Sequence, residues 1–303
     1  MLYLSFIMIL VCVLVSVAFY TLLERKVLGY IQLRKGPNKV GIIGILQPFS
    51  DAVKLFMKEQ NFLFIYNMLI YLMVPVLALF LMLLFWLIFP WSFFQMEMDY
   101  GLVMMLCISS LGVYVILGGG WASNSKYSLL GAYRGVAQVI SYEVSMSMIL
   151  IGIVMFISSY NLNLIINFQK SLWMLFGFIF SFSIWIVTGL AETNRTPFDF
   201  AEGESELVSG FNVEYSGGGF AMLFMAEYGN MIFMSMVTAI MFFGGKGFFM
   251  MKIMLIMFLF LWVRGTFARY RYDNLMMLAW KIILPYSIFV LFFMVLFKMY
   301  LLM

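Results

Sequence analysis

Long apolar stretches divide this chain, and they limit it to one class of fold. A helix of about 20 apolar residues crosses the hydrocarbon part of a bilayer, because each residue adds about 1.5 Å. About eight such stretches follow one another along the sequence: 2–23, 68–94, 100–122, 136–164, 172–191, 220–243, 248–263 and 282–303. We therefore expect an all-α polytopic membrane protein with about eight transmembrane helices.

The composition agrees with this class. Of 303 residues, 65% are hydrophobic and only 11% are charged, whereas a soluble chain of this length needs a polar exterior rich in Lys and Glu. The net charge of +4 then bears on orientation across the membrane, and we expect no nucleic-acid partner. Residues 1–303 are predicted to form a single transmembrane domain.

Basic residues alternate between the two sides of the predicted membrane. They are frequent in the loops after the first, third, fifth and seventh stretches, and the opposite loops contain only Lys170, Lys246 and Lys252, with Lys298 near the C-terminus. The positive-inside rule places the basic loops on the cytoplasm-like side and both termini opposite. The first stretch is too long for a cleaved signal and is expected to remain as a helix.

Cofactor ligands are scarce in the sequence. The chain contains no His, and Cys12 and Cys107 lie in separate apolar stretches without metal-ligand spacing. Haem, zinc and iron–sulfur ligation are therefore not expected, and the usual general base of a hydrolase is missing. We predict no catalytic residue and no metal ligand, and assign both cysteines to apolar packing.

Acidic residues concentrate in one segment, which we predict to be an acidic inner-side loop over about 192–217. Its carboxylates include Glu192, Asp199, Glu202, Glu204 and Glu206. A solvated loop would explain this run. Pro197, Phe198 and Phe200 are interleaved with the acids, however, and aromatic residues so placed are typical of a loop packed against another surface.

Two further carboxylates, Glu143 and Glu227, fall inside apolar stretches. A charge there costs on the order of 2.5 to 3.5 kcal/mol, so such residues are usually functional. Glu143, Glu192 and Glu227 belong to consecutive helices, which favours a proton relay. The alternative is that they are neutral and hydrogen-bonded to neighbouring helices.

Residues 46–58 predict an amphipathic helix. Its apolar face comprises Leu46, Phe49, Val53, Phe56 and Met57, and its polar side Asp51, Lys54 and Lys58. Such a helix could lie along the inner membrane interface or simply connect its neighbours.

Several motifs, taken together, resemble one family. Residues 23–38, 47–52, 141–143, 191–199, 201–210 and 269–273 are similar, in order and from end to end, to the subunit 1 family of mitochondrial NADH:ubiquinone oxidoreductase, respiratory complex I. Many relatives have Pro before the motif at 269–273, whereas this chain has Ala268, so the seventh helix is expected to run further before it ends.

The resemblance implies roles for particular residues. It places a ubiquinone tunnel at Arg25, Arg34, Asp51, Phe220, Phe224 and Met225. It places proton coupling at Tyr142, Glu143, Glu192, Asp199, Glu202, Glu204, Glu206 and Glu227. Arg195 would stabilise the loop by holding its carboxylates.

The same resemblance implies the surroundings. Ubiquinone would be the substrate, while NADH, FMN and iron–sulfur clusters would be held by partner subunits. The partners would be hydrophilic-arm subunits at the quinone site, antiporter-like membrane subunits and lipid, in the mitochondrial inner membrane with the basic and acidic loops facing the matrix. The alternatives are the membrane anchor of an energy-converting hydrogenase and a free-standing proton-coupled transporter, although the latter predicts internal repeats that are not evident.

Overall fold

The computed structural model describes residues 2–60, 66–90, 98–170, 172–201, 203 and 210–302. The described residues form helices and contain no strand, which confirms the all-α prediction. The longer helices are α1 (Leu2–Ile31), α2 (Gln47–Met57), α3 (Met68–Phe85), α4 (Gly101–Ala122), α5 (Lys126–Ile157), α8 (Ile179–Glu192), α10 (Gly217–Phe243), α11 (Phe249–Thr266) and α13 (Leu284–Leu302). The shorter ones are α6 (Leu162–Phe168), α7 (Met174–Gly177), α12 (Tyr272–Met277), three 3-10 turns, η1 (Ile42–Gly44), η2 (Trp86–Ile88) and η3 (Gly210–Asn212), and the π-helical segment η4 (Leu278–Ile283).

Within the described residues, seven helices are long and apolar enough to cross a membrane. The fifth of the eight predicted spans, 172–191, is interrupted, because Phe178 leaves the helical region and separates α7 from α8. Helix α8 has 14 residues, so it is about 21 Å long and shorter than the hydrocarbon core. The sequence located the apolar stretch correctly but did not reveal its break.

Three of the helices also have boundaries that differ from the sequence prediction. Helix α5 begins at Lys126 rather than at residue 136, since its first turns bury small residues in place of large apolar ones, and it ends before Ser158, which is left-handed. Helix α1 continues to Ile31 and carries the charged residues after residue 23. Helix α11 ends at Thr266 rather than at residue 263, in the direction expected from Ala268.

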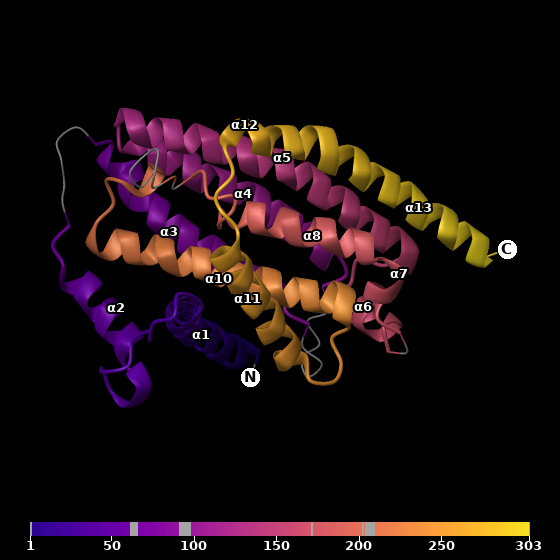
Figure 1. The fold of residues 1–303 in the computed structure, drawn as a ribbon, viewed down its shortest axis with the longest axis horizontal. Coiled ribbons are helices and arrows are strands. Elements are labelled where there is room, and N and C mark those ends of the chain that lie inside the picture. Colours follow the sequence, from indigo (N-terminus) through magenta and orange to yellow (C-terminus); the bar gives the residue numbers. More distant parts are fainter. Residues whose placement is uncertain are drawn as a thin grey trace.

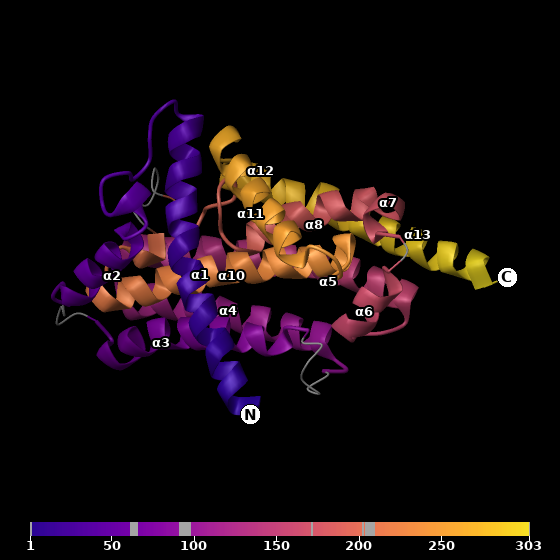
Figure 2. The same ribbon diagram turned by 90° about the horizontal axis from the view of Figure 1, so that it is seen from below.

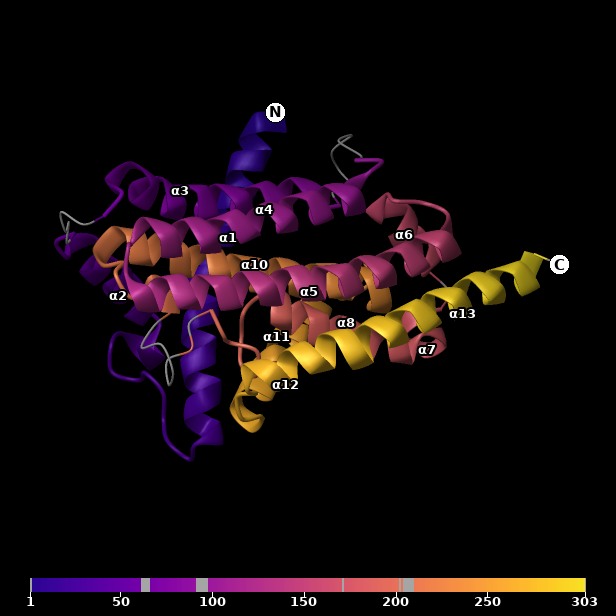
Figure 3. The same cartoon turned by 90° about the horizontal axis from the view of Figure 1, so that it is seen from above.

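Helices α3, α4, α5 and α10 run side by side along the long axis of the molecule (Figure 1). Helix α1 crosses α10 steeply (Figure 2), and α13 packs along α5 on another face (Figure 3). Helix α10 is the central element. In its most apolar stretch of 18 residues, 67% are buried inside the protein, whereas the corresponding share in α1 is 17%. The site described below surrounds this central helix.

Helices α4 and α5 approach each other closely at Gly120. A Cβ atom added to Gly120 would overlap the Ala132 methyl group and the Ser128 carbonyl oxygen of α5. Gly112, two turns earlier on the same helix, has no atom within 4 Å of that position. Of these two glycines, Gly120 is therefore the one that the spacing of α4 and α5 requires.

We expect Gly120→Ala to lower the thermal unfolding midpoint of the detergent-solubilised protein. Overpacking of this kind costs about 1–3 kcal/mol. Gly112→Ala is the matched control, since it makes the same exchange on the same helix without a neighbour to displace. Equal midpoints for the two variants would show that α4 and α5 can separate freely.

Candidate functional site

The loop after α8 is held against α5 by Gln138. This side chain is fully buried, and its Nε2 donates to the carbonyl oxygens of Ala191 (2.8 Å) and Phe198 (2.6 Å). These two carbonyls flank the segment 192–197, which begins with Glu192, the last residue of α8. One side chain therefore fixes both ends of this segment.

Aromatic contacts continue the attachment. The Phe198 ring lies 5.9 Å from Tyr142 of α5 and 5.7 Å from Tyr270, measured between centroids. The Tyr270 amide donates to the Pro197 carbonyl at 3.2 Å. The part of the loop around Pro197 and Phe198 is thus enclosed between α5 and the chain that precedes α12, as the aromatic residues interleaved with the acids predicted.

The tyrosine of the predicted proton path points away from the carboxylates. The Tyr142 hydroxyl donates to the Leu275 carbonyl oxygen at 3.4 Å. It therefore links α5 to α12 through a side chain that is almost completely buried.

A cavity of about 100 Å³ lies between α3, α4, α5, α8 and α10. Glu192, Glu227 and Asn230 line it together with apolar side chains, and we call it the acidic cavity. Ser109 also lines it and donates to Glu143 Oε1 at 3.3 Å. Two of the three carboxylates expected from consecutive helices, Glu192 and Glu227, thus line one cavity, and the third, Glu143, is joined to its wall through Ser109.

Two oxygens of this group are available for additional hydrogen bonds. Oε2 of Glu192 and Oδ1 of Asn230 are buried and make no hydrogen bond with the described residues. A buried carboxylate oxygen without a donor favours the protonated form of the acid or contact with water. The volume of the cavity is sufficient for several water molecules.

Arg195 reaches from the loop to α10. Its Nη2 lies 3.8 Å from Glu227 Oε2, and its guanidinium lies 4.3 Å from the centre of the Tyr228 ring. The loop carboxylates Glu202, Glu204 and Glu206 lie outside the described residues. The role assigned to Arg195 towards them stays a prediction.

Asp199 is paired with a different arginine. Arg269 Nη2 donates to Asp199 Oδ2 at 3.2 Å, and the Asp199 side chain is buried. Sequence reasoning did not assign Arg269 to the site. Its position in the motif at 269–273 was a signal that could have identified it.

Glu24 and Arg264 form an ion pair between α1 and α11. Glu24 is 4% exposed, so it is a further buried carboxylate that sequence reasoning missed. One turn earlier on α1, the Tyr20 ring meets Tyr228 of α10 edge to face at 5.8 Å. The predicted first stretch ended at residue 23, one residue before Glu24. A prediction that extended this helix to Ile31 would have included Glu24 and marked it as a carboxylate within a helix.

The residues expected to form the tunnel are only partly brought together. Arg25 Nη1 donates to Asp51 Oδ2 at 2.5 Å and so links α1 to α2, while Gln47 Nε2 donates to Asp51 Oδ1 at 2.9 Å. The rings of Phe220 and Phe224 lie 4.3 Å apart on α10. Met225 is half-buried on the same helix, and Arg34 is exposed in the turn after α1.

Helix α2 occupies residues 47–57, close to the predicted range. Its apolar side chains Phe49, Val53, Phe56 and Met57 are exposed, although Phe49 also meets Phe19 of α1 edge to face at 6.0 Å. Its position at a membrane surface stays a prediction.

A second attachment holds the end of the loop to α3. The rings of Tyr66, Tyr71 and Tyr215 are stacked at 4.8 and 4.3 Å, and the Tyr66 hydroxyl donates to Glu214 Oε2 at 2.6 Å. Burial, followed by this hydrogen bond and the charge of Glu214, raises the pKa of Tyr66. Tyr66 therefore stays a neutral donor at physiological pH.

No group of three or more acidic or Cys side chains in the described part of the chain could hold a metal ion. The site therefore consists of a packed loop, buried ion pairs and carboxylates around a cavity. Together with the seven spans, these features define an α-helical polytopic membrane protein with buried ionisable groups between its helices.

Comparison with known proteins gives the family. The model of the NADH dehydrogenase family matches residues 4–295, and the chain belongs to this family. It is 53% identical to NADH-ubiquinone oxidoreductase chain 1 of Aedes aegypti, over 97% of this chain and 95% of the relative. It is 54% identical to the protein of the same name from Locusta migratoria, over 96% of this chain and 93% of the relative. It is 51% identical to the one from Heterololigo bleekeri, over 94% of this chain and 93% of the relative.

We expect Gln138→Leu to release the loop from α5. The substitution removes both donated hydrogen bonds, and each buried carbonyl left without a donor costs about 1–3 kcal/mol. Hydrogen–deuterium exchange of the peptide covering 190–203 should become faster in the intact protein. Ser147→Ala is the control, since the Ser147 hydroxyl bonds only to Val144 of its own helix; equal exchange in both variants would contradict the role of Gln138.

Proposed function

We propose that this chain is a core membrane subunit of the proton-pumping NADH:ubiquinone oxidoreductase, complex I, in the mitochondrial inner membrane. The observation that carries this proposal is the 53% identity across 97% of the chain to a protein named as chain 1 of that enzyme. The redox carriers NADH, FMN and iron–sulfur clusters would belong to partner subunits. Consistent with this, the chain has no His, and its two Cys residues lie on α1 and α4.

The tunnel for ubiquinone would lie where α1, α2 and the start of α10 meet. The Arg25–Asp51 pair would provide polar contacts for the quinone head group, and Phe220 and Phe224 would contact its apolar parts. Helices α1 and α2 contact each other and both contact α10, which supports this arrangement. Arg34 and Met225 would complete the wall.

The proton-coupling path would begin at the loop and continue into the acidic cavity. Reduction of ubiquinone takes up electrons and protons, so negative charge formed near the tunnel must be compensated. Arg195 lies between the loop and Glu227, and Glu227 shares the cavity with Glu192. A change in charge at the tunnel would therefore act on Glu227 first and on Glu192 and Glu143 next.

Antiporter-like membrane subunits would receive this change, and hydrophilic-arm subunits would complete the quinone site. The basic loops and the acidic loop would face the matrix, with both termini on the intermembrane side. Asp199, Glu202, Glu204 and Glu206 would form the part of the path nearest to the hydrophilic arm.

Substitution of Glu192 by Gln tests the path. The amide keeps the shape of the side chain but cannot exchange a proton, so we expect NADH-driven ubiquinone reduction and proton transport to fall on the order of tenfold or more. Both rates are measured on the complex reconstituted in vesicles, with assembly checked by native electrophoresis.

Asp273→Asn provides the matched control, since Asp273 is an exposed carboxylate paired with the exposed Arg271. It should leave both rates unchanged. If the Glu192→Gln complex assembles fully and still reduces ubiquinone and pumps protons at the normal rates, Glu192 is excluded from the path.

Crosslinking tests the tunnel separately. An azido-quinone bound to the intact complex and then photolysed should label peptides within residues 20–60 and 200–230, because these regions contain the proposed wall. Labelling should fall when excess ubiquinone competes. If the labelling that ubiquinone suppresses lies only in other parts of the chain, the assigned tunnel is contradicted. This result would not bear on the proposed path through the carboxylates.

A further inference from the structure

The far ends of α6 and α10 are joined by a buried glutamine. Gln169 is 3% exposed, and its Nε2 donates to the carbonyl oxygens of Ile240 (3.0 Å) and Met241 (2.9 Å) in the last turns of α10. Gly245 packs on Ile166 of α6. These contacts hold the turn after α6 against the turn after α10.

Lys252 of α11 fixes the second turn. Its Nζ donates to the carbonyl oxygens of Phe243 (2.8 Å), Gly244 (2.9 Å) and Lys246 (2.9 Å), and it lies 4.9 Å from the centre of the Trp173 ring. The charge of Lys252 is thus used within the protein. The backbone that carries Lys246 is held in place.

These attachments bring two other lysines together. Lys170 and Lys246 are both exposed. Lys170 directly follows Gln169, and Gly244 packs on Gln169, so the two lysines stand on adjacent turns. Partial desolvation and the positive charge of Lys170 lower the pKa of Lys246. No ion pair joins either lysine to a carboxylate in the described part of the chain, so an anion bound between them would relieve their repulsion.

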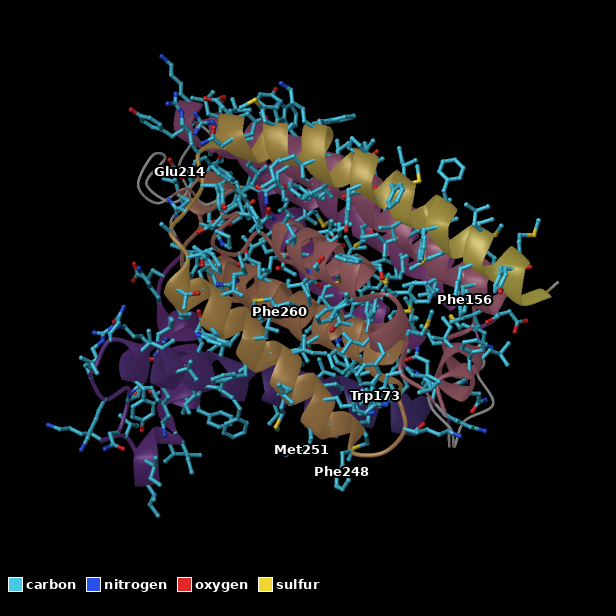
Figure 4. The ribbon with its side chains drawn as sticks, turned by 45° about the vertical axis from the view of Figure 1, so that its right-hand side comes forward. Phe156, Trp173, Glu214, Phe248, Met251 and Phe260 are labelled. Atoms are coloured by element: carbon cyan, nitrogen blue, oxygen red, sulfur yellow. The ribbon has the colours of Figure 1, made fainter. Side chains whose placement is uncertain are left out.

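The surroundings of this lysine pair are those of a membrane interface. Large apolar side chains close to the lysine pair in the sequence are exposed: Phe248 (87% exposed), Leu172 (74%) and Phe176 (73%). Figure 4 shows Phe248, Met251 and Trp173 at one corner of the molecule. A Trp beside exposed apolar residues is typical of the level at which lipid headgroups meet acyl chains.

We propose that Lys170 and Lys246 bind the phosphate of an anionic phospholipid, whose acyl chains lie on the exposed apolar residues at the start of α11 and around α7. A soluble phosphate would use the lysines but gain nothing from the apolar surface, whereas a phospholipid uses both. Lysine ammonium groups near the headgroup level also favour anionic lipids over zwitterionic ones. This site is independent of the ubiquinone tunnel, since it lies at the opposite ends of the helices.

Photolabelling of the intact, delipidated complex tests the site. The probes are phosphatidylglycerol and phosphatidylcholine that carry the same diazirine in one acyl chain. We expect phosphatidylglycerol to label the peptides covering 165–180 and 244–256 preferentially. Its half-saturating concentration should rise about fivefold in Lys170→Gln and on the order of thirtyfold in the double variant Lys170→Gln, Lys246→Gln.

Lys298→Gln is the matched control, because its amino group lies on the same side of the membrane and donates to the Met155 carbonyl oxygen. It should retain the wild-type preference, as should the charge-preserving double variant Lys170→Arg, Lys246→Arg. Equal labelling by the two lipids in the wild-type complex would overturn the proposal without the use of any variant.

A competition with inorganic phosphate distinguishes a lipid from a free anion. Millimolar phosphate that abolished the preference, when chloride at the same ionic strength did not, would assign the lysines to a small soluble anion and overturn the lipid site. A preference that survives phosphate and is lost only in the Gln double variant supports it.

Discussion

The buried side chain of Gln138 is the contact on which the site depends. It satisfies two carbonyls that flank Glu192 and the turn after it, and neither carbonyl has access to bulk water. An irregular segment buried in a membrane protein is tolerated only when its polar backbone groups find partners in the protein. A single amide on α5 therefore allows the loop to pack inside the molecule, and the loop in turn delivers Glu192 to the acidic cavity.

Buried charge is distributed unevenly around this loop. Arginines stand next to three of the carboxylates: Arg195 next to Glu227, Arg264 next to Glu24, and Arg269 next to Asp199. Glu143 and Glu192 have no arginine partner among the described ion pairs. Paired carboxylates are stabilised in the charged form, whereas unpaired ones in an apolar cavity take up a proton more readily. In the proposed mechanism, Glu143 and Glu192 would therefore be the carboxylates that exchange protons.

The sequence predicted the class, most apolar spans and the carboxylates that meet at the cavity. Hydropathy identifies a membrane span, because the hydrocarbon core requires apolar residues along the whole length of the helix that crosses it. The sequence does not reveal which side chains form ion pairs. It identifies Arg195 as a charged residue in a loop, but it does not predict that Arg195 contacts Glu227 on another helix. The break at Phe178 was equally invisible, since Phe is as apolar as its neighbours and only its backbone departs from the helix.

Glu24 shows a further reason for such misses. The first predicted stretch ended at residue 23, before three consecutive charged residues at 24–26, yet α1 continues through all of them to Ile31. Two of these charges point to partners on other helices, Glu24 to Arg264 and Arg25 to Asp51. A helix can therefore carry charge beyond its apolar span when neighbouring helices supply the counter-charges.

Arg195 occupies the position where the two halves of the proposed mechanism meet. Its guanidinium lies over Tyr228, which faces Tyr20 of α1, and its distance of 3.8 Å from Glu227 is longer than a direct charged hydrogen bond. A pair at this distance is held by charge more than by geometry, so protonation of Glu227 would weaken it strongly. In the proposed mechanism, a charge formed on the α1 side would compete for Arg195 and change the proton affinity of Glu227 without any large movement of the helices. The loop held by Gln138 would then act as a fixed frame, against which small shifts of one arginine are sufficient to couple the tunnel to the cavity.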